Sequence, residues 1–182
     1  MIAPGDGSSL RNARTPRPAW IVEAAWVLLL FAGALMLRCL HLGTWSFWAD
    51  ELATLRDAKQ LREVLGYPVG YALIGAFVSW RGATEFAARF IPALAGALTV
   101  PLVYLLGRRM YSARVGGIAS VWMALSCFHL FFSQFARYYT LVTLFGLGAM
   151  ACAWQGFERN DRRWLGAGVA LLALAFWTHW SA

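Results

Sequence analysis

Residues 19–40 read AWIVEAAWVLLLFAGALMLRCL, and this stretch decides the fold class. About 20 consecutive apolar residues are enough for a helix to cross the hydrocarbon core of a bilayer. The stretch is also too long to be the apolar region of a secretory signal peptide. We therefore predict a first membrane-spanning helix over Ala19–Leu40, with Glu23 at the depth of the interface.

The composition of the whole chain supports the same conclusion. Of its 182 residues, 60% are hydrophobic and only 14% are charged, and the mean hydropathy is +0.55. An ordinary soluble domain is about 45–50% apolar and about 25% charged, so too few polar residues remain to cover a soluble surface. The three cysteines have no metal-ligand spacing, and their odd number argues against a disulfide framework.

Four further apolar runs have lengths that suit spanning helices, at about 86–106, 115–132, 141–157 and 164–180. A polar stretch from Leu42 to Gly66 precedes them. Within it, the leucines of residues 51–65 recur on one side, which predicts an amphipathic helix on the membrane surface. Residues 67–80 number only fourteen, so we expect a re-entrant or interfacial helix there.

The net charge of +7 comes from 16 Lys and Arg against 9 Asp and Glu. The bases lie in short clusters between apolar runs, which is typical of membrane topology, and we predict no nucleic-acid partner. Three arginines lie in each of residues 1–18, 107–114 and 158–163. All three clusters face the cytoplasm only if residues 67–80 do not cross. The prediction is five spans in a cell (plasma or inner) membrane, with a disordered cytoplasmic tail over residues 1–18.

The first candidate for chemistry is the acid pair Asp50 and Glu51, which follows the aromatic residues of WSFWADE (45–51). One interpretation is an aromatic belt at the interface followed by solvated acids. The other is a general base, because a carboxylate beside an apolar aromatic surface has a raised proton affinity. The residues alone leave both open.

The second candidate is SQFARYY (133–139), in which tyrosines follow Arg137. An arginine in this setting can hold a phosphate, and the alternative is an arginine that snorkels to the interface. Arg89 and His179 lie on the same predicted side. Arg89 can also be a snorkelling arginine, and His179 can be a hydrogen-bonded residue of the interface belt. His41 and His129 have no supporting motif. No nucleotide-binding fingerprint or zinc-type spacing occurs, so we predict no metal ligands.

Five stretches, in order, resemble the polyprenyl-phosphate-sugar-dependent glycosyltransferases of the GT-C class. The closest resemblance is to bacterial members related to protein O-mannosyltransferases and lipid A aminoarabinose transferases. The stretches are RCLHLGTWSFWADE (38–51), YPVGYALIGAF (67–77), TEFAARFIPALAGALTVPLVYLLGRRMYS (84–112), SCFHLFFSQFARYYTL (126–141) and WTHWSA (177–182). The resemblance covers about residues 19–182. It implies an all-α integral membrane protein, a GT-C type multi-span helical bundle with about five transmembrane helices and juxtamembrane helices in the first outer loop.

The resemblance also implies roles for individual residues. Asp50 matches the family's catalytic acid, which takes the proton of the acceptor hydroxyl while that oxygen attacks C1 of the sugar. The polyprenyl phosphate then leaves, and the anomeric centre is inverted. Glu51 would support Asp50 or contact the acceptor. Substrate-binding roles are implied for Arg137, Tyr138, Arg89, Tyr71 and His179.

Some positions depart from the family pattern. Phe135 stands where a Glu is frequent, Tyr67 stands where a His is frequent, and Val69 replaces the second Pro of the family's segment. Family members usually have more spans, so we expect an N-terminal portion, truncated relative to them, with little or no transfer by residues 1–182 alone.

The implied donor is a polyprenyl-phosphate sugar, and the acceptor is a protein, a lipid or a glycan. The use of a divalent metal stays open. The alternative to an enzyme is a non-catalytic membrane accessory protein or an inactive fragment. A channel or transporter would need ionisable residues buried in mid-span, which the predicted spans lack apart from Glu23 and residues near their ends.

Overall fold

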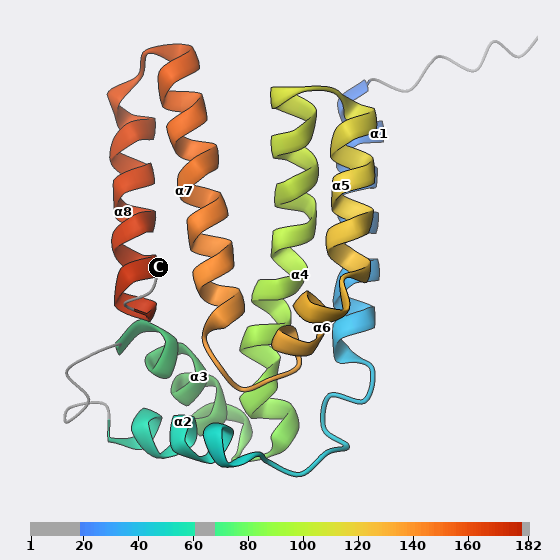
Figure 1. Ribbon diagram of the computed structural model, residues 1–182. Coiled ribbons are helices and arrows are strands. Elements are labelled where there is room, and N and C mark those ends of the chain that lie inside the picture. Colours follow the sequence, from blue (N-terminus) through green and yellow to red (C-terminus); the bar gives the residue numbers. More distant parts are fainter. Residues whose placement is uncertain (1–18, 61–67, 180–182) are drawn as a thin grey trace, which may run out of the picture.

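The computed structural model describes residues 19–60 and 68–179, and the regular secondary structure within them is all helical (Figure 1). The helices of this part are α1 (Ala19–Cys39), α2 (Ala49–Lys59), α3 (Pro68–Arg81), α4 (Glu85–Met110), α5 (Ala113–Leu125), α6 (Cys127–Ser133), α7 (Tyr139–Arg159) and α8 (Arg162–Thr178). The all-α class predicted from the sequence is confirmed. The tail 1–18 and the second part of the predicted amphipathic helix lie outside the described residues.

Three helices of the described part, α1, α4 and α7, are long and apolar enough to cross a membrane. The pair α5 and α6 is bent by 58° and makes a fourth candidate if it counts as one span. This differs from the five spans predicted. The predicted span 115–132 is broken at Ser126, whose hydroxyl accepts the backbone N–H of His129 and caps a new helix. The last predicted span forms α8, which has 17 residues.

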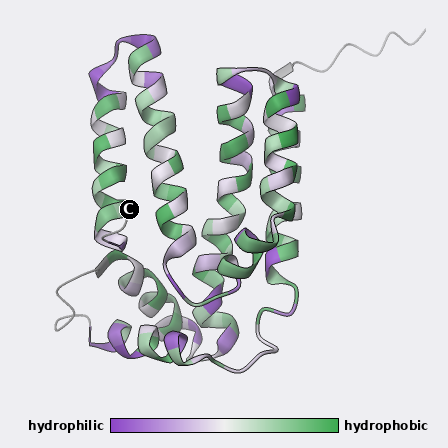
Figure 2. Ribbon diagram, viewed as in Figure 1, coloured by the Kyte–Doolittle hydropathy of each residue, from purple (hydrophilic) through white to green (hydrophobic). Residues whose placement is uncertain are grey.

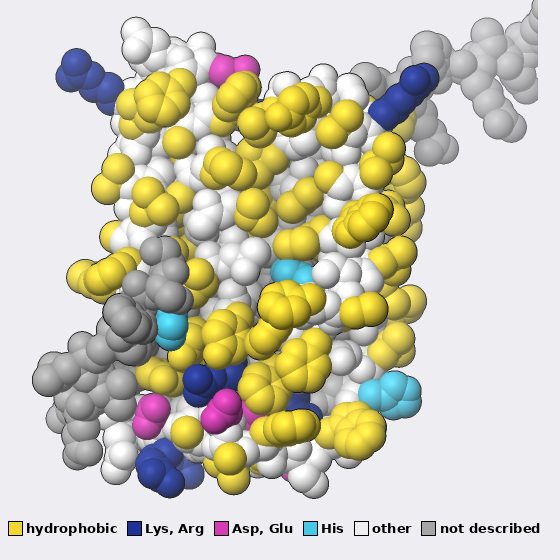
Figure 3. Space-filling view, in the orientation of Figure 1, with side chains coloured by type: hydrophobic (Ala, Val, Ile, Leu, Met, Phe, Trp, Pro, Cys, Tyr) yellow, Lys and Arg dark blue, Asp and Glu magenta, His cyan; other side chains and the backbone are white. Residues whose placement is uncertain are grey.

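The connections between helices divide into two groups at the two ends of the bundle. The N-terminus of α1 and the α4–α5 and α7–α8 connections lie at one end, while α2, α3 and the α6–α7 connection lie at the other (Figure 1). Hydropathy follows this division, because the hydrophilic residues concentrate near the two ends (Figure 2). On the face drawn in Figure 3, hydrophobic side chains cover the middle of the bundle. The arginines of 107–114 and 158–163 therefore share one end, the arrangement that the charge pattern requires.

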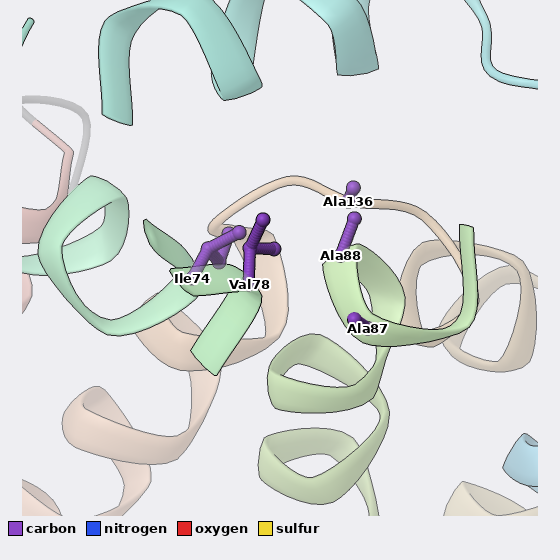
Figure 4. Close-up of a cluster of buried hydrophobic side chains, with 5 residues drawn as sticks. All are labelled: Ile74, Val78, Ala87, Ala88 and Ala136. Carbon is purple, nitrogen blue, oxygen red and sulfur yellow. The ribbon is translucent and has the colours of Figure 1, made fainter. Parts of the chain in front are cut away.

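Helix α4 is the central element, in contact with α1, α3, α5, α6 and α7. Small residues along α4 allow these close approaches; the buried ones include Ala87, Ala88, Ala93, Ala95, Gly96 and Ala97. Near its start, Ala87 and Ala88 pack with Ile74 and Val78 of α3 and with Ala136 (Figure 4). This cluster holds α3 and the α6–α7 connection against the first turns of α4.

Helix α5 approaches the other end of α4 through a glycine. A Cβ added at Gly116 would meet the carbonyl oxygen of Tyr104, and it would lie 2.8 Å from the backbone nitrogen of Arg108. The next residue, Gly117, has nothing within 4 Å of such a Cβ. The α4–α5 hairpin is therefore packed backbone to backbone on the side of Gly116.

Candidate active site

A buried ion pair between Glu51 of α2 and Arg89 of α4 lies at the centre of the α2–α3 end. Glu51 is 0% exposed and Arg89 is 3% exposed. The Nη2 of Arg89 lies 2.7 Å from Oε2 of Glu51, and its Nε donates to Oε1 at 2.8 Å. A buried pair is favourable only when its remaining donors and acceptors are also satisfied.

Backbone groups satisfy both partners. Glu51 accepts the backbone N–H of Ala136 at 2.7 Å and that of Trp48 at 3.0 Å. Arg89 donates to backbone carbonyls of the α1–α2 connection, those of Leu42, Trp45 and Ser46. With the two bonds to Glu51, all five N–H groups of the guanidinium have acceptors. The pair therefore joins the α1–α2 connection, α2, α4 and the α6–α7 connection.

The environment of Glu51 keeps it ionised. Burial raises the pKa of its carboxyl. The hydrogen bonds from Arg89, Ala136 and Trp48 and the charge of Arg89 together lower the pKa by more than burial raises it, so the pKa lies below its usual value. Both oxygens are occupied by donors. Asp50, the preceding residue, lies exposed on the first turn of α2.

The motif SQFAR is anchored residue by residue. Ser133 Oγ accepts from Nε of Arg38 at 3.2 Å. Gln134 donates to the backbone carbonyls of Arg38 and Leu40, at 3.2 and 2.9 Å. Ala136 is fully buried and gives its N–H to Glu51. These bonds to α1 and α2 fix the position of Arg137, which follows.

Arg137 reaches back to α2. Its Nη1 donates to the backbone oxygen of Asp50 and to Oγ1 of Thr54, both at 3.3 Å, and its Nη2 donates to the hydroxyl of Tyr138. Within residues 19–60 and 68–179, no carboxylate forms an ion pair with Arg137, and its buried Nε has no hydrogen-bond partner. The charge of Arg137 is therefore not neutralised there, in contrast to that of Arg89.

Tyr138 connects this arginine to α3 and to the end of α8. Its ring lies 5.9 Å edge-on from that of Tyr71 and stacks on His179 at 4.5 Å. Burial raises the pKa of Tyr71 to about 12, and the nearby Tyr138 and Asp57 raise it as well. Burial also lowers the pKa of His179, with a smaller contribution from Arg137. Tyr71 therefore keeps its hydroxyl proton, and His179 is a neutral imidazole at neutral pH.

Residues 62–182 match the family model described as dolichyl-phosphate-mannose-protein mannosyltransferase, PMT. The match covers more than half of the chain. The chain belongs to the PMT family. Comparisons with curated proteins and with solved structures find no significant match. The GT-C resemblance is thereby confirmed, and the chain is an integral membrane protein with a PMT-family glycosyltransferase domain. The match begins after Asp50 and Glu51, so it does not extend to these two acids.

The predicted site residues of this PMT-family chain separate into two groups. One is a cluster around Arg137, whose guanidinium donates to the backbone oxygen of Asp50 and to the hydroxyl of Tyr138. The rings of Tyr71 and His179 pack against the ring of Tyr138. The other is the ion pair of Glu51 and Arg89, whose hydrogen-bonding groups are occupied. In the described part of the chain, no group of three or more His, Cys, Asp or Glu side chains could hold a metal ion.

Sequence reasoning missed a second buried network, and the expectation that His129 lacks a supporting constellation is wrong. Arg38 is 0% exposed, and its Nη2 lies 2.9 Å from Nδ1 of His129. The Nε2 of His129 lies 3.3 Å from Oγ1 of Thr99. Because a guanidinium only donates, Nδ1 accepts and Nε2 carries the proton. The available signal was an arginine inside an apolar run.

Two cavities adjoin the two groups of predicted site residues, one beside Arg89 and one beside His179. One of about 300 Å³ lies between the α1–α2 connection and α6, with walls that include Trp45, Trp48, Phe131 and Phe135. The other, of about 400 Å³, lies between α6 and α7 and has His179 and Tyr139 in its wall. Both are lined largely by aromatic side chains.

Proposed function

We propose that this chain carries catalytic residues of a membrane glycosyltransferase that uses a polyprenyl-phosphate sugar. In the proposal, Arg137 binds the phosphate of the donor and Asp50 is the general base. The observation that carries it is the guanidinium of Arg137, held beside Asp50 with a free buried Nε–H and no carboxylate partner among the described residues. The family's description favours mannose as the sugar and a protein as the acceptor, and a lipid or glycan acceptor is the alternative.

The chemistry of the cluster suits a phosphate monoester or diester. Arginine binds phosphate oxygens by charge-assisted hydrogen bonds, which are about twice as strong as neutral ones. The hydroxyl of Tyr71 keeps its proton and is hydrogen-bonded to Asp57, so its ring packs against Tyr138 without adding a donor. Arg89 has no donor left for a ligand, so we assign Arg89 and Glu51 as positioning residues that hold α2 and the α6–α7 connection.

Transfer in this proposal is a single displacement. The carboxylate of Asp50 takes the proton of the acceptor hydroxyl, and the oxygen attacks C1 of the sugar from the side opposite to the phosphate. The bond between C1 and the phosphate oxygen breaks as the new glycosidic bond forms. Arg137 stabilises the negative charge that develops on the departing polyprenyl phosphate. The product has the inverted anomeric configuration.

The arginine clusters support an orientation for this reaction. Positively charged connections are retained in the cytoplasm, and two of the three clusters lie at the end opposite to α2 and α3 (Figure 1). We therefore assign the α2–α3 end to the extracytoplasmic side and the N-terminus to the cytoplasm.

The proposal is tested by Asp50→Asn, introduced into the gene in its own cells, so that every product of the gene carries the change. Sugar transfer from polyprenyl-phosphate mannose is measured in isolated membranes. We expect a loss of at least about 100-fold with the amount of protein unchanged, because the side chain of Asp50 is exposed and forms no hydrogen bond or ion pair with the residues that the structure describes. Glu158→Gln, an exposed acid at the other end, is the control and should keep wild-type transfer.

Two outcomes contradict the proposal. Full transfer by Asp50→Asn excludes this residue as the base. Membranes of wild-type cells that show no more transfer than cells without the gene exclude the enzyme and favour a non-catalytic accessory protein.

A further inference from the structure

Thr54 lies one turn after Asp50 on α2, and its side chain is buried between polar partners. It is 0% exposed. Its hydroxyl donates to the backbone oxygen of Asp50 at 3.1 Å, and its Oγ1 lies 3.3 Å from Nη1 of Arg137. A threonine hydroxyl has one proton, and a guanidinium can only donate. The proton therefore goes to Asp50, and the lone pairs of Oγ1 accept from Arg137.

Helix α2 holds the α6–α7 connection at two points that are one turn apart. Glu51 and Thr54 are three positions apart, so they share the buried face of the helix. Glu51 accepts the backbone N–H of Ala136, whereas Thr54 accepts the side chain of Arg137. The first bond fixes the backbone of the connection, and the second acts on the guanidinium itself.

The acceptor that Thr54 offers to Arg137 is neutral. Its hydroxyl shares Nη1 with the backbone oxygen of Asp50, and both acceptors lie at 3.3 Å. A neutral acceptor orients a guanidinium without cancelling its charge, whereas a carboxylate at the same position would do both. Thr54 therefore fixes the direction of Arg137 and leaves its charge for a ligand.

We propose that Thr54 is a positioning residue of the transfer reaction, which sets the guanidinium of Arg137 relative to Asp50. The inference rests on the proposed function, in which Arg137 binds the donor phosphate and Asp50 takes the acceptor proton. One hydroxyl connects the two, because it bonds to the backbone of the base and to the side chain of the arginine. Because Thr54 is fully buried, it acts through Arg137 and not by contact with a substrate.

The test compares Thr54→Val, which keeps the shape of the side chain without the hydroxyl, with Thr54→Ser, which keeps the hydroxyl. Each change is made in the gene in its own cells, and transfer is measured in isolated membranes over a range of polyprenyl-phosphate mannose concentrations. A misplaced Arg137 still attracts the donor but stabilises the transition state less. We therefore expect Thr54→Val to lower kcat at least about tenfold and to change KM less than about twofold. Thr54→Ser should keep kcat within about threefold of the wild type.

Two controls separate positioning from a general structural effect. Ser120→Ala removes another fully buried hydroxyl, which bonds to the carbonyl of Gly117 in α5, and it should change neither constant. In an Arg137→Met background, Thr54 has lost its partner on the α6–α7 connection. Adding Thr54→Val there should lower the remaining kcat by less than about twofold.

The possible failures are distinguishable. A wild-type kcat in Thr54→Val, equal losses in Thr54→Val and Thr54→Ser, or a rise in KM alone each overturn the inference and leave the proposed function standing. If Thr54→Val does not accumulate in the membrane, Thr54→Ala replaces it, and a wild-type kcat in that variant overturns the inference in the same way. Failure of the proposed function shows instead in the wild type, as no more transfer than in membranes of cells without the gene.

Discussion

The adjacent acids Asp50 and Glu51 lie in opposite environments, because neighbouring residues of a helix point in different directions. Successive residues of an α-helix point about 100° apart. Glu51 turns inward to Arg89 and the backbone of Ala136, whereas Asp50 stays exposed. Of the two side chains, only that of Asp50 is open to a ligand. The geometry therefore favours Asp50 over Glu51 as the base, and it gives Glu51 the task of holding Asp50 and Arg137 in place.

The ion pair predicts a large cost for Glu51→Gln. The change leaves the guanidinium of Arg89 buried without its counter-charge, and breaking a buried pair costs about 3–5 kcal/mol. Unfolding free energy in detergent at pH 7 should fall by about this amount, while the exposed Glu158→Gln should change little. A Glu51→Gln protein as stable as the wild type would contradict the structural role of the pair.

The same variant should respond less to acid. The pKa of Glu51 in the folded protein lies below its unfolded value of about 4.3. Its contribution to stability is therefore complete above about pH 4.3 and is lost as the pH falls through the folded pKa. Between pH 5 and pH 3 the wild type should lose more unfolding free energy than Glu51→Gln. Parallel losses in the two proteins would exclude this linkage.

At the scale of the elements, apolar length was the reliable signal. The runs that became α1, α4 and α7 were predictable because a span needs a minimum number of apolar residues. The helix α3 has fourteen residues, fewer than a span needs, so its interpretation as a re-entrant or interfacial helix followed from the same length rule. The break between α5 and α6 was not, because a serine that caps a helix looks like any small residue inside an apolar run.

The packing of α5 on α4 makes a sharp prediction for two neighbouring glycines. Gly116→Ala puts a methyl group against the backbone of Tyr104 and Arg108, and overpacking of this kind costs about 1–3 kcal/mol. Gly117→Ala meets nothing within 4 Å and should be neutral or stabilising by up to about 1 kcal/mol, because alanine has the higher helix propensity. Thermal unfolding of both variants checks the prediction. Equal effects of the two changes would mean that α5 does not pack on α4 in this register.

At the scale of the whole molecule, the arrangement of charge predicts the topology. Tyr111→Cys and Glu158→Cys, at the end of the arginine clusters, should react with a membrane-impermeant maleimide only after the cells are opened. Lys59→Cys, at the α2–α3 end, should react in intact cells. The background is a chain with Ala in place of Cys39, Cys127 and Cys152. The reverse pattern would invert the orientation, and labelling of all three in intact cells would contradict a membrane-spanning bundle.

The site was predictable only in part from the sequence. The resemblance pointed to Asp50, Arg137, Tyr138, Tyr71 and His179, which the fold brings to one end. The partnership of Glu51 and Arg89 was not predictable, because the two residues are 38 positions apart and no local pattern reveals a tertiary ion pair. The network of Arg38 and His129 was missed for the same reason, since its members come from α1, α4 and α6.

The central claim is that the guanidinium of Arg137, which has no carboxylate partner in residues 19–60 and 68–179, binds the phosphate of a polyprenyl carrier. The most direct measurement is the Kd of polyprenyl phosphate and of the uncharged polyprenol for the chain in nanodiscs. The account predicts that the phosphate binds at least tenfold more tightly than the alcohol, a difference of about 1.4 kcal/mol. Arg137→Gln should remove this preference, and Arg81→Gln, an exposed arginine on α3, should keep it. Equal Kd values for the phosphate and the alcohol, or an unchanged preference in Arg137→Gln, would contradict it.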